Sequence, residues 1–421
     1  MMIKREEMQQ IVSDFKDKPT IVIFGSHSAI ETGLSSKKMG LKNIVIVKRG
    51  RDRQYLQEQS HLFDEVVVVN KWKDMLDSKV QKKLLKRNGI IIPNRSMVVY
   101  LGADEIENDL KIPIYGSRTM LKSEDRTTSE KKYIDQYGLL KQSGIRSPRE
   151  ISKDELDIIG IDKEIPVALV KVQQADNPIE RAFFYTTSED DYHKQVKTMK
   201  KKGLINDQTL EEARIEEFII GPYFNCNGWA SGLNKNKVKT HTIDEGINWL
   251  KISHDPFEHP YSDWDFVGFG QRIQTNSSGF LNLPANIQQQ IGDKIKIKNE
   301  EIGHTMATMR ESKMNEIVGS IPKFLNIAEK IYPPGMIGLF GLQGAVPINA
   351  KTNRPDWVVF DISMRVPGDP AIAASPQMNS LTLKYKKYLP KGVSQITSPI
   401  DLPMIEIIQA FKTGRQSEIV T

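Results

Sequence analysis

Three polar side chains near the C-terminal end of the sequence have a spacing that could bind a charged ligand. Asp361, Ser363 and Arg365 occupy alternate positions of the segment 357–366, WVVFDISMRV. Because successive side chains of a strand point to opposite faces, these three would share one face, with a carboxylate, a hydroxyl and a guanidinium. The polar outer face of an antiparallel sheet gives the same pattern, and the pattern alone favours that interpretation. The residues between them would pack the other face: Phe360, Ile362 and Met364.

A second segment adds an amide to this set. Gln343 is an isolated polar residue in the apolar segment 336–346, MIGLFGLQGAV. If its strand lies beside that of Asp361, the two side chains offer two oxygen ligands for a hard cation. Mg²⁺ suits such a pair because it binds oxygen, keeps several waters and shares its remaining positions with phosphates. The two residues are therefore the predicted magnesium ligands.

Charged residues also occur in two predicted strands in the middle of the chain. Lys171 interrupts the apolar segment 167–172, and a lysine is costly to bury unless it is paired or lies at a phosphate. An outward or edge position on a half-buried strand is an equally good interpretation. In the segment 214–221, Glu216 and Glu217 precede an apolar pair. Since neighbours on a strand point to opposite sides, only one of these carboxylates can face a ligand.

The N-terminal part of the chain alternates between β-branched runs and amphipathic stretches. Near-continuous apolar strands separated by helices are typical of a parallel, doubly wound sheet. Ligands of such sheets bind beyond the carboxyl ends of the strands, where loops meet helix N-termini. The predicted strands are 21–24, 43–48, 65–70, 90–94 and 112–116, and the predicted helices are 29–39, 53–59, 72–88 and 96–106.

Two of these strand ends carry polar residues that could bind an anion. The first strand ends in the Ser-His-Ser of 26–28, and the fourth ends in the Asn-Arg-Ser of 94–96. Hydroxyls, backbone N–H groups and the imidazole of His27 would suit a phosphate, and the residues around Ser96 could close the same site. The alternative is that Ser28 only caps the following helix. Position and composition favour the anion site.

Composition restricts the class of protein. With 39% apolar and 27% charged residues in 421, the chain is that of a globular protein with two or three domains. No apolar run is long enough for a membrane span and no signal core is present, so we expect a cytoplasmic protein without a membrane partner. A net charge of +6 without a basic, aromatic stripe argues against nucleic acid. The single cysteine, Cys226, excludes an intrachain disulfide and is expected to be a small, half-buried hydrophobe.

Beyond about residue 118 the pattern changes to strands and helices in mixed order. We expect three units: residues 1–117 with the parallel sheet, 118–222 as a small lobe with a linker strand, and 223–421 as a large lobe. The predicted helices of the last two are 131–145, 190–203 and 286–332. The predicted strands are 167–172, 181–186, 214–221, 336–346 and 356–366, with strands and long loops over 241–285.

The order of these features resembles the ATP-grasp ligases: a strand-borne lysine, a Glu-Glu linker strand, then paired metal ligands and an arginine. Within that superfamily the chain is similar to the archaeal formate-dependent ligases of purine biosynthesis. Seven segments from about residue 20 to about 390 carry the similarity. They are GSHSAIETG (25–33), KRGRDRQY (48–55), IIIPNRSMVVYLG (90–102), IPIYGSR (112–118), QRIQTNSSG (271–279), GMIGLFGLQ (335–343) and VVFDISMRVPGD (358–369).

The resemblance implies a fold and a reaction. The fold would be an N-terminal doubly wound parallel sheet followed by a two-lobed ATP-grasp domain, a mixture of α/β and α+β architecture. The family joins formate to the amine of 5-aminoimidazole-4-carboxamide ribonucleotide, using ATP and Mg²⁺, through a formyl phosphate. The implied partners are therefore small-molecule substrates, formate and a purine-precursor ribonucleotide, and we expect a homo-oligomer.

Residue by residue, the resemblance also implies roles. His27 and Ser96 would bind the ribonucleotide, with Asn276 reaching it from the other lobe, and Ser28 joins them through the strand-end argument. Lys171 would hold ATP phosphates. The remaining assignments are Arg126 on another phosphate, Glu216 or Glu217 with the backbone of Phe218 and Ile219 at the adenine, Gln343 and Asp361 on Mg²⁺, and Arg365 on the acyl phosphate.

Three departures from the family pattern keep alternatives open. The family has a glycine-rich loop after the strand lysine, whereas 173–184 contains no glycine. At the strand end near 94 the family usually reads Pro-His-Gly-Ser, where this chain has Asn94 and Arg95. The segment 254–271 also differs from the family. The alternatives are an ATP-grasp paralogue that ligates a different carboxylate and amine, and a non-catalytic nucleotide-binding homologue.

Overall fold

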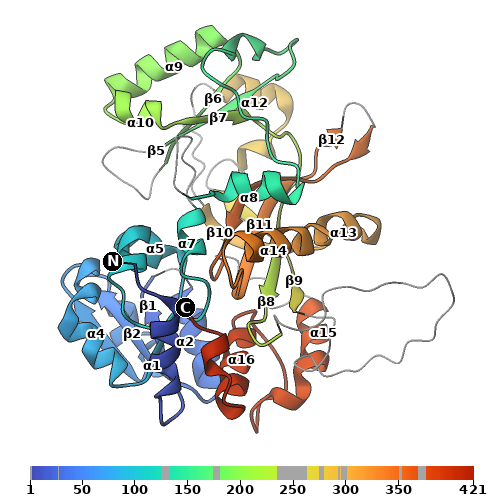
Figure 1. Ribbon diagram of the computed structural model, residues 1–421. Coiled ribbons are helices and arrows are strands. Elements are labelled where there is room, and N and C mark those ends of the chain that lie inside the picture. The colour runs from blue at the N-terminus through green and yellow to red at the C-terminus, as the bar shows by residue number, and fades with distance from the viewer. Residues whose placement is uncertain are drawn as a thin grey trace, which may run out of the picture.

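The computed structural model forms three tiers around three main sheets (Figure 1). A three-stranded sheet with its helices lies at one end, and a five-stranded sheet lies in the middle. A four-stranded parallel sheet lies at the other end, beside the C-terminal helices. The described residues are 2–26, 28–124, 133–173, 181–234, 263–274, 279–292, 294, 301–349, 353–367 and 376–421.

The parallel sheet is built from the apolar runs of the N-terminal part. Its strands are β1 (Thr20–Phe24), β2 (Lys42–Lys48), β3 (Glu65–Val69) and β4 (Gly89–Ile92), in the order β3-β2-β1-β4. β1 and β4 are buried along their whole length, whereas the edge strand β3 is mostly half-buried. The strand order reverses between β1 and β4, which makes their carboxyl ends the switch point of the sheet.

Two of the predicted helices in this part are broken. The helix predicted over 72–88 divides into a 3₁₀ turn (Trp72–Leu76) and α4 (Ser78–Leu85), because Asp77 between them is extended. The helix predicted over 96–106 divides at Gly102, whose φ of 97° lies outside the helical region. The predicted helix 53–59 is a single turn. The helices are α1 (Arg5–Ser13), α2 (Ala29–Lys38), α3 (Arg53–Leu56), α5 (Arg95–Leu101), α6 (Ala103–Asn108) and α7 (Met120–Ser123).

The strand predicted over 112–116 is reduced to isolated bridges. Ile114 pairs in parallel with Ile91, and Tyr115 pairs antiparallel with Val420. Pro113 has no N–H to donate, so it adds only its carbonyl, which accepts from the Ile91 N–H at 2.9 Å. The segment therefore joins the C-terminal end of the chain to β4 without becoming a full fifth strand.

The small lobe is an antiparallel sheet covered by helices. β5 (Ala168–Gln173) is its central strand, between β6 (Arg181–Thr186) and β7 (Arg214–Glu217). β7 ends at Glu217, earlier than the predicted 221. α9 (Glu189–Lys201) begins at the N-cap Ser188, which accepts from an amide in its first turn, and α10 (Asp207–Glu211) follows it.

The five-stranded sheet contains one strand where a helix was predicted. Its order is β10-β9-β8-β11-β14, antiparallel throughout. The helical prediction for 286–332 is wrong over β10, because this edge strand lacks the apolar alternation that would distinguish it from its helical neighbours. The strands are β8 (Tyr223–Ala230), β9 (Trp264–Gln274), β10 (Glu301–Ala307), β11 (Gly338–Ala345) and β14 (Val358–Ser363), and β12 (Ile348–Asn349) pairs separately with β13 (Arg354–Pro355).

Helices cover this sheet and form much of its core. The amphipathic helix α14 (Ser320–Ile331) packs its apolar side into the same cluster as α8 (Gln136–Ser143). Cys226 of β8 lies in this cluster, fully buried, and burial raises the pKa of its thiol. It is thus a core residue, more deeply buried than expected. The remaining helices are α12 (Ala285–Ile291), α13 (Glu311–Val318), α15 (Pro376–Tyr385) and α16 (Asp401–Lys412).

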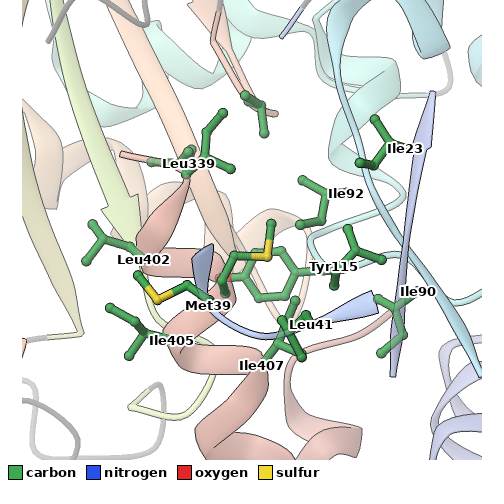
Figure 2. Packing of buried hydrophobic residues seen from close by; sticks show 14 of the residues in the cluster. Ile23, Met39, Leu41, Ile90, Ile92, Tyr115, Leu339, Leu402, Ile405 and Ile407 are labelled. Atoms are coloured by element: carbon green, nitrogen blue, oxygen red, sulfur yellow. The ribbon is translucent and has the colours of Figure 1, made fainter. Parts of the chain in front are cut away.

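One apolar cluster joins the parallel sheet to the C-terminal helices and to the large sheet. Figure 2 shows Ile23 of β1 and Ile92 of β4 near the ring of Tyr115, with Leu339 of β11 and Ile405 of α16 close by. Because a buried core fixes the positions of the elements that share it, the switch point is held against the large sheet. Among the described residues, no helix is both long and apolar enough to cross a membrane.

A buried carboxylate lies within this junction. Glu406 of α16 is fully buried and accepts hydrogen bonds from the Tyr115 hydroxyl at 2.7 Å, the Leu233 N–H at 3.2 Å and the Ser231 hydroxyl. The Trp229 indole donates in turn to the Tyr115 hydroxyl at 3.0 Å. Burial raises the pKa of Glu406, and these hydrogen bonds oppose the rise.

We expect Glu406 to make stability depend on pH. Because its folded-state pKa lies above the ordinary value of 4.5, the folded protein binds more protons than the unfolded chain above that value, and this group's contribution falls as the pH rises. The Glu406→Gln variant has no proton to lose. The free energy of unfolding in urea of the variant, minus that of the parent protein, should therefore increase as the pH is raised from about 4.5 to about 7.5. A difference that stays constant over this range would contradict the assignment.

Candidate active site

The first part of the site lies at the switch point of the parallel sheet. Asn94 joins the two strand ends: its side-chain amide donates to the Phe24 carbonyl at 2.9 Å, and its oxygen accepts from the Met97 N–H at 3.0 Å as the N-cap of α5. Ser28 and Ser96 follow β1 and β4 at this same edge. The structure thus brings the predicted strand-end residues together where open parallel sheets bind their ligands.

The loop after β1 has a strained backbone. Ser26 and Ser28 have φ angles of 90° and 61°, in the left-handed region that costs a non-glycine residue about 1–2 kcal/mol. Ser28 makes no side-chain capping bond to α2, so the capping interpretation is wrong. Its hydroxyl instead donates to the Pro367 carbonyl at 3.3 Å. Strain of this kind is typical of functional loops, and here it directs the loop toward the segment after β14.

The end of β14 meets the end of β4. The Val366 N–H donates to the Pro93 carbonyl at 3.1 Å, and Val366 forms a parallel bridge with Asn94. Arg365 immediately precedes this contact. The residue predicted to bind the acyl phosphate is therefore held beside the residues predicted to bind the ribonucleotide, although some 270 positions of sequence separate them.

Arg365 is a buried cation. Only 8% of the residue is exposed, and burial lowers the pKa of its guanidinium while the neighbouring carboxylate of Glu124 opposes the change. Its guanidinium donates to the Val366 carbonyl at 3.4 Å. A cation at this depth requires a counter-charge.

Gln343 and Asp361 are cross-strand neighbours, as the magnesium prediction requires. They lie directly opposite each other on β11 and β14, and Asn225 of β8 lies opposite Gln343 on the other side. The Gln343 amide nitrogen donates to the Ser363 hydroxyl at 3.1 Å. Its buried side-chain oxygen has no hydrogen-bond partner among the described residues. An orphan oxygen beside a carboxylate is a donor set that fits a hard cation.

An arginine of β9 contacts the carboxylate of this pair. Arg272 of β9 places its guanidinium Nη2 at 3.6 Å from a carboxylate oxygen of Asp361, which lies three strands away in the sheet. The sequence analysis included Arg272 in a motif but gave it no role. The same face thus carries Asn225, Gln343 and Asp361 with a guanidinium directed toward them.

Of the three apolar residues expected to pack the other face of this segment, one is not fully buried. A bulge between Gln343 and Gly344 of β11 shifts the register, and Phe360 is only half-buried. Its ring lies 5.9 Å from the Lys171 ammonium, whereas Ile362 and Met364 enter the core as predicted.

Lys171 is buried on the central strand of the small lobe, so the edge interpretation is wrong. Its ammonium forms an ion pair with Glu216 of the neighbouring β7 and donates to the Tyr137 hydroxyl at 2.9 Å. Glu217 points the other way and is half-exposed, near Arg146. Of the two adjacent carboxylates, therefore, only Glu216 faces the lysine, as strand geometry requires.

Tyr137 connects the small lobe to the large sheet. Its hydroxyl lies 3.0 Å from a carboxylate oxygen of Glu216 and 3.3 Å from the Phe360 carbonyl. The guanidinium of Arg214 lies 3.5 Å from the centre of its ring, in cation–π contact. Lys171 is thereby linked through one hydroxyl to the residue that precedes Asp361. The lysine predicted to bind phosphates and the predicted metal ligand belong to one connected arrangement.

Sequence reasoning missed Tyr137 and Arg214. Tyr137 lies in α8, and an aromatic residue in a predicted helix is usually interpreted as part of the core. Arg214 lies opposite Lys171 on β7 and pairs with both Glu150 and Glu216, at 2.6 Å and 3.1 Å. Only the strand register reveals that two cations share Glu216.

The segment after β7 has the backbone arrangement of a linker. The Phe218 N–H donates to the Val167 carbonyl at 3.0 Å, so this amide is already bonded within the small lobe. The ring of Phe218 contacts the ring of Tyr185 edge to face. Ile219 is buried against the end of the large sheet. The adenine-binding role of Phe218 and Ile219 stays a prediction, with the Phe218 carbonyl and the Ile219 amide as the groups to test.

Three predicted site residues lie outside the described residues: His27, Arg126 and Asn276. Residues 174–180 of the glycine-free loop and residues 254–262 do so as well. The described site therefore consists of the switch-point serines, the Arg365 region, the Gln343 and Asp361 pair, and the Lys171 cluster.

Comparison with solved structures defines the fold. The IMP biosynthesis protein PurP from Thermococcus kodakaraensis matches with a TM-score of 0.61 and 18% identity, over 95% of this chain and 100% of that one. A biotin carboxylase from Campylobacter jejuni, in a complex with β,γ-ATP, matches with a TM-score of 0.52 and 10% identity, over 90% of this chain and 74% of that one. At these identities the likeness shows the fold. It is an ATP-grasp fold preceded by a parallel-sheet domain, as predicted.

The family follows from the sequence comparisons. Residues 191–421, more than half of the chain, match the family described as a domain of unknown function, DUF1297, and this chain belongs to that family. Residues 21–151 match a protein of unknown function, DUF1246.

Curated relatives carry a functional name. Proteins of Methanopyrus kandleri and Methanocaldococcus jannaschii are 28% and 27% identical to this chain. The matches cover 89% and 87% of this chain and 90% and 88% of the relatives. Both are named 5-formaminoimidazole-4-carboxamide-1-(beta)-D-ribofuranosyl 5'-monophosphate synthetase. The family resemblance inferred from the motifs is confirmed by these relatives.

If the Lys171 cluster binds nucleotide phosphates as predicted, Tyr137→Phe should weaken that binding. Loss of the hydroxyl removes one hydrogen-bond partner of Lys171 while its ion pair with Glu216 remains, which draws the ammonium toward Glu216 and away from a phosphate. We expect the Kd for ADP to rise about three- to tenfold, the effect of one ordinary hydrogen bond of about 1 kcal/mol. Calorimetric titration measures this change. Tyr192→Phe, at another buried tyrosine of the small lobe, is the control and should leave the ADP affinity unchanged.

Proposed function

We propose that this protein is an ATP-dependent ligase that joins formate to the amine of 5-aminoimidazole-4-carboxamide ribonucleotide. The γ-phosphoryl group of ATP passes to a formate oxygen, giving ADP and formyl phosphate. The amine then attacks the carbonyl carbon, loses a proton and displaces phosphate. The ATP-grasp fold, the names of the curated relatives and the arrangement of charged groups support this function.

One observation carries the proposal: the backbone contact between Val366 and Pro93. It holds Arg365 beside the switch point of the parallel sheet, where Ser28 and Ser96 lie. A ligase of this kind must generate its acyl phosphate within reach of the amine that attacks it, because free formyl phosphate would be lost to water. In the proposed reaction, this contact would bring the two half-reactions to one place.

The protein's own part in the reaction is to position the reactants and neutralise charge. Lys171, fixed by Glu216 and Tyr137, would bind ATP phosphates, and Arg365 would bind the acyl phosphate. Fixed cations in a site of low dielectric stabilise charge that spreads over the transferring phosphoryl group without reorganising during the reaction. His27 and Asn276 complete the proposed ribonucleotide site.

Gln343 and Asp361 would hold Mg²⁺. The orphan oxygen of Gln343 beside the carboxylate of Asp361 fits this ion, and two protein ligands leave room for phosphate oxygens and water. When bound, Mg²⁺ supplies charge neutralisation to the phosphates of ATP. Asp361 would then exchange its contact with Arg272 for one with the ion.

A specific observation favours a second candidate function, the ligation of a different carboxylate. Arg95 stands where the family usually has glycine, and it adds a partly exposed guanidinium next to Ser96. An extra cation at this position would suit an acceptor or carboxylate with a further negative charge.

The decisive experiment is a phosphate-release assay with ATP, Mg²⁺, formate and the imidazole ribonucleotide, combined with mass spectrometry of the product. Release that requires all components, together with the formamido product, supports the proposed ligase. Release with other carboxylates or amines, and not with these, identifies the second candidate. Nucleotide binding without release under any combination identifies a non-catalytic homologue.

Asp361→Asn should remove the metal-dependent step. We expect kcat to fall by about 100-fold or more, because several kcal/mol of charge stabilisation are lost. The fold should survive, since Asp361 is only half-buried and its cross-strand backbone pairing does not depend on the side chain. Asp356→Asn, at a half-buried carboxylate that pairs with Arg146 and has no predicted role in the site, is a matched control for the change in charge. A wild-type rate in Asp361→Asn would remove Asp361 from the metal site.

A further inference from the structure

A buried carboxylate outside the predicted site contacts Arg365. Glu124 lies at the C-terminal end of α7 and is only 6% exposed. One of its oxygens accepts from the Met364 N–H at 2.6 Å and lies 3.3 Å from the Arg365 Nε. Its other oxygen lies 3.4 Å from a guanidinium nitrogen of Arg95. A single carboxylate thus lies between an arginine of the N-terminal part and the arginine at the end of β14.

The position of Glu124 determines which edge of Arg365 faces outward. A guanidinium is planar and carries five N–H donors in a fixed fork, so a contact at Nε sets the direction of the whole group. Glu124 lies at the Nε edge as an ion pair at 3.3 Å, without a hydrogen bond to Nε, and one terminal nitrogen donates to the Val366 carbonyl at 3.4 Å. These two contacts restrict the direction of the guanidinium before any substrate binds.

We propose that Glu124 is a positioning residue for the ligase reaction, which holds Arg365 in the direction that binds the acyl phosphate. The proposal rests on the proposed function and adds a residue to it. Glu124 touches no reacting atom and acts through Arg365.

A purely structural role does not explain the charge of Glu124. β14 is an edge strand, and one N–H group within it and one just after its end are bonded by side chains of α8 and of the C-terminal end of α7. Gln136 accepts from the Ile362 N–H at 2.7 Å, as Glu124 does from Met364. A neutral amide oxygen is thus sufficient to cap this edge. The negative charge of Glu124 is required instead by the two guanidiniums beside it.

The balance of charge around Arg365 predicts a distinctive effect of neutralising Glu124. Arg95, Arg272 and Arg365 together carry three positive charges, against two negative charges on Glu124 and Asp361. Removal of the Glu124 charge raises the local positive potential, so a simple anion should bind more tightly. The same change releases the Nε edge of Arg365, so the reaction should become slower. A merely destabilising substitution would not produce these opposite effects.

The test is Glu124→Gln, which keeps an oxygen for the Met364 N–H and removes the charge. We expect kcat to fall about 10- to 100-fold, the usual cost of a misplaced catalytic group, without a rise in the KM for the carboxylate. We expect the Kd for inorganic phosphate, measured by calorimetry, to fall about three- to tenfold. Glu124→Asp, which keeps the charge, should recover part of the rate.

Two further variants make the result specific. Glu316→Gln removes the charge of a carboxylate of α13 that pairs with Lys313, outside this cluster, and it should change neither kcat nor the affinity for phosphate. In Glu124→Gln with Arg365→Met, the gain in phosphate affinity should disappear, because the gain requires the guanidinium of residue 365.

The outcomes separate this proposal from the proposed function. An unchanged phosphate affinity in Glu124→Gln, or a gain that survives Arg365→Met, overturns the role of Glu124. So does a kcat within twofold of the parent protein. If the parent protein catalyses no formyl transfer, the proposed function fails, and the phosphate titrations alone then decide whether Glu124 controls Arg365.

Discussion

The structure depends on one constraint: Lys171 and Arg365, two buried cations of the described site, each require a buried counter-charge. Lys171 is paired with Glu216, and Arg365 is paired with Glu124. All four side chains are less than a tenth exposed. An isolated charge at such depth would cost many kcal/mol, so the elements that carry the carboxylates must be held where the cations lie. The packing that positions these elements therefore also determines the electrostatics of the site.

The segment around α7 and α8 connects these pairs to the backbone of the large sheet. Gln136 and Glu124 bond the N–H groups of Ile362 and Met364 along the free edge of β14, and Tyr137 bonds the carbonyl of Phe360. An unpaired sheet edge needs partners for its N–H and C=O groups. Here the partners are the same side chains, or their immediate neighbours, that contact Lys171 and Arg365. Closing the sheet edge and orienting the site are achieved by the same contacts.

Sequence patterns predicted the parts of the molecule in which local periodicity and burial agree. The strands of the parallel sheet, and Lys171 as a costly charge in an apolar strand, could be inferred this way. The pairing of Gln343 with Asp361 could be stated only as a condition, because the local pattern of a strand does not show which strand lies beside it. β10 could not, because an edge strand of mixed polar residues has no period that distinguishes it from a helix. Glu124 and Tyr137 were also missed. Their partners lie 241 and 34 positions away in the chain, and only strand register and helix docking bring them together.

The two ion pairs differ in how they are held, and this difference has a consequence for the reaction. Lys171 and Glu216 lie on adjacent strands of one sheet, so their pairing is fixed within the small lobe. Arg365 and Glu124 lie on separate elements, and Glu124 also contacts Arg95 of the N-terminal part. Their geometry therefore depends on the junction of the parallel sheet with the large lobe. In the proposed reaction, the cation for ATP would be prepared by one lobe, whereas the cation for the acyl phosphate would be correctly placed only where the site for the attacking amine is also assembled.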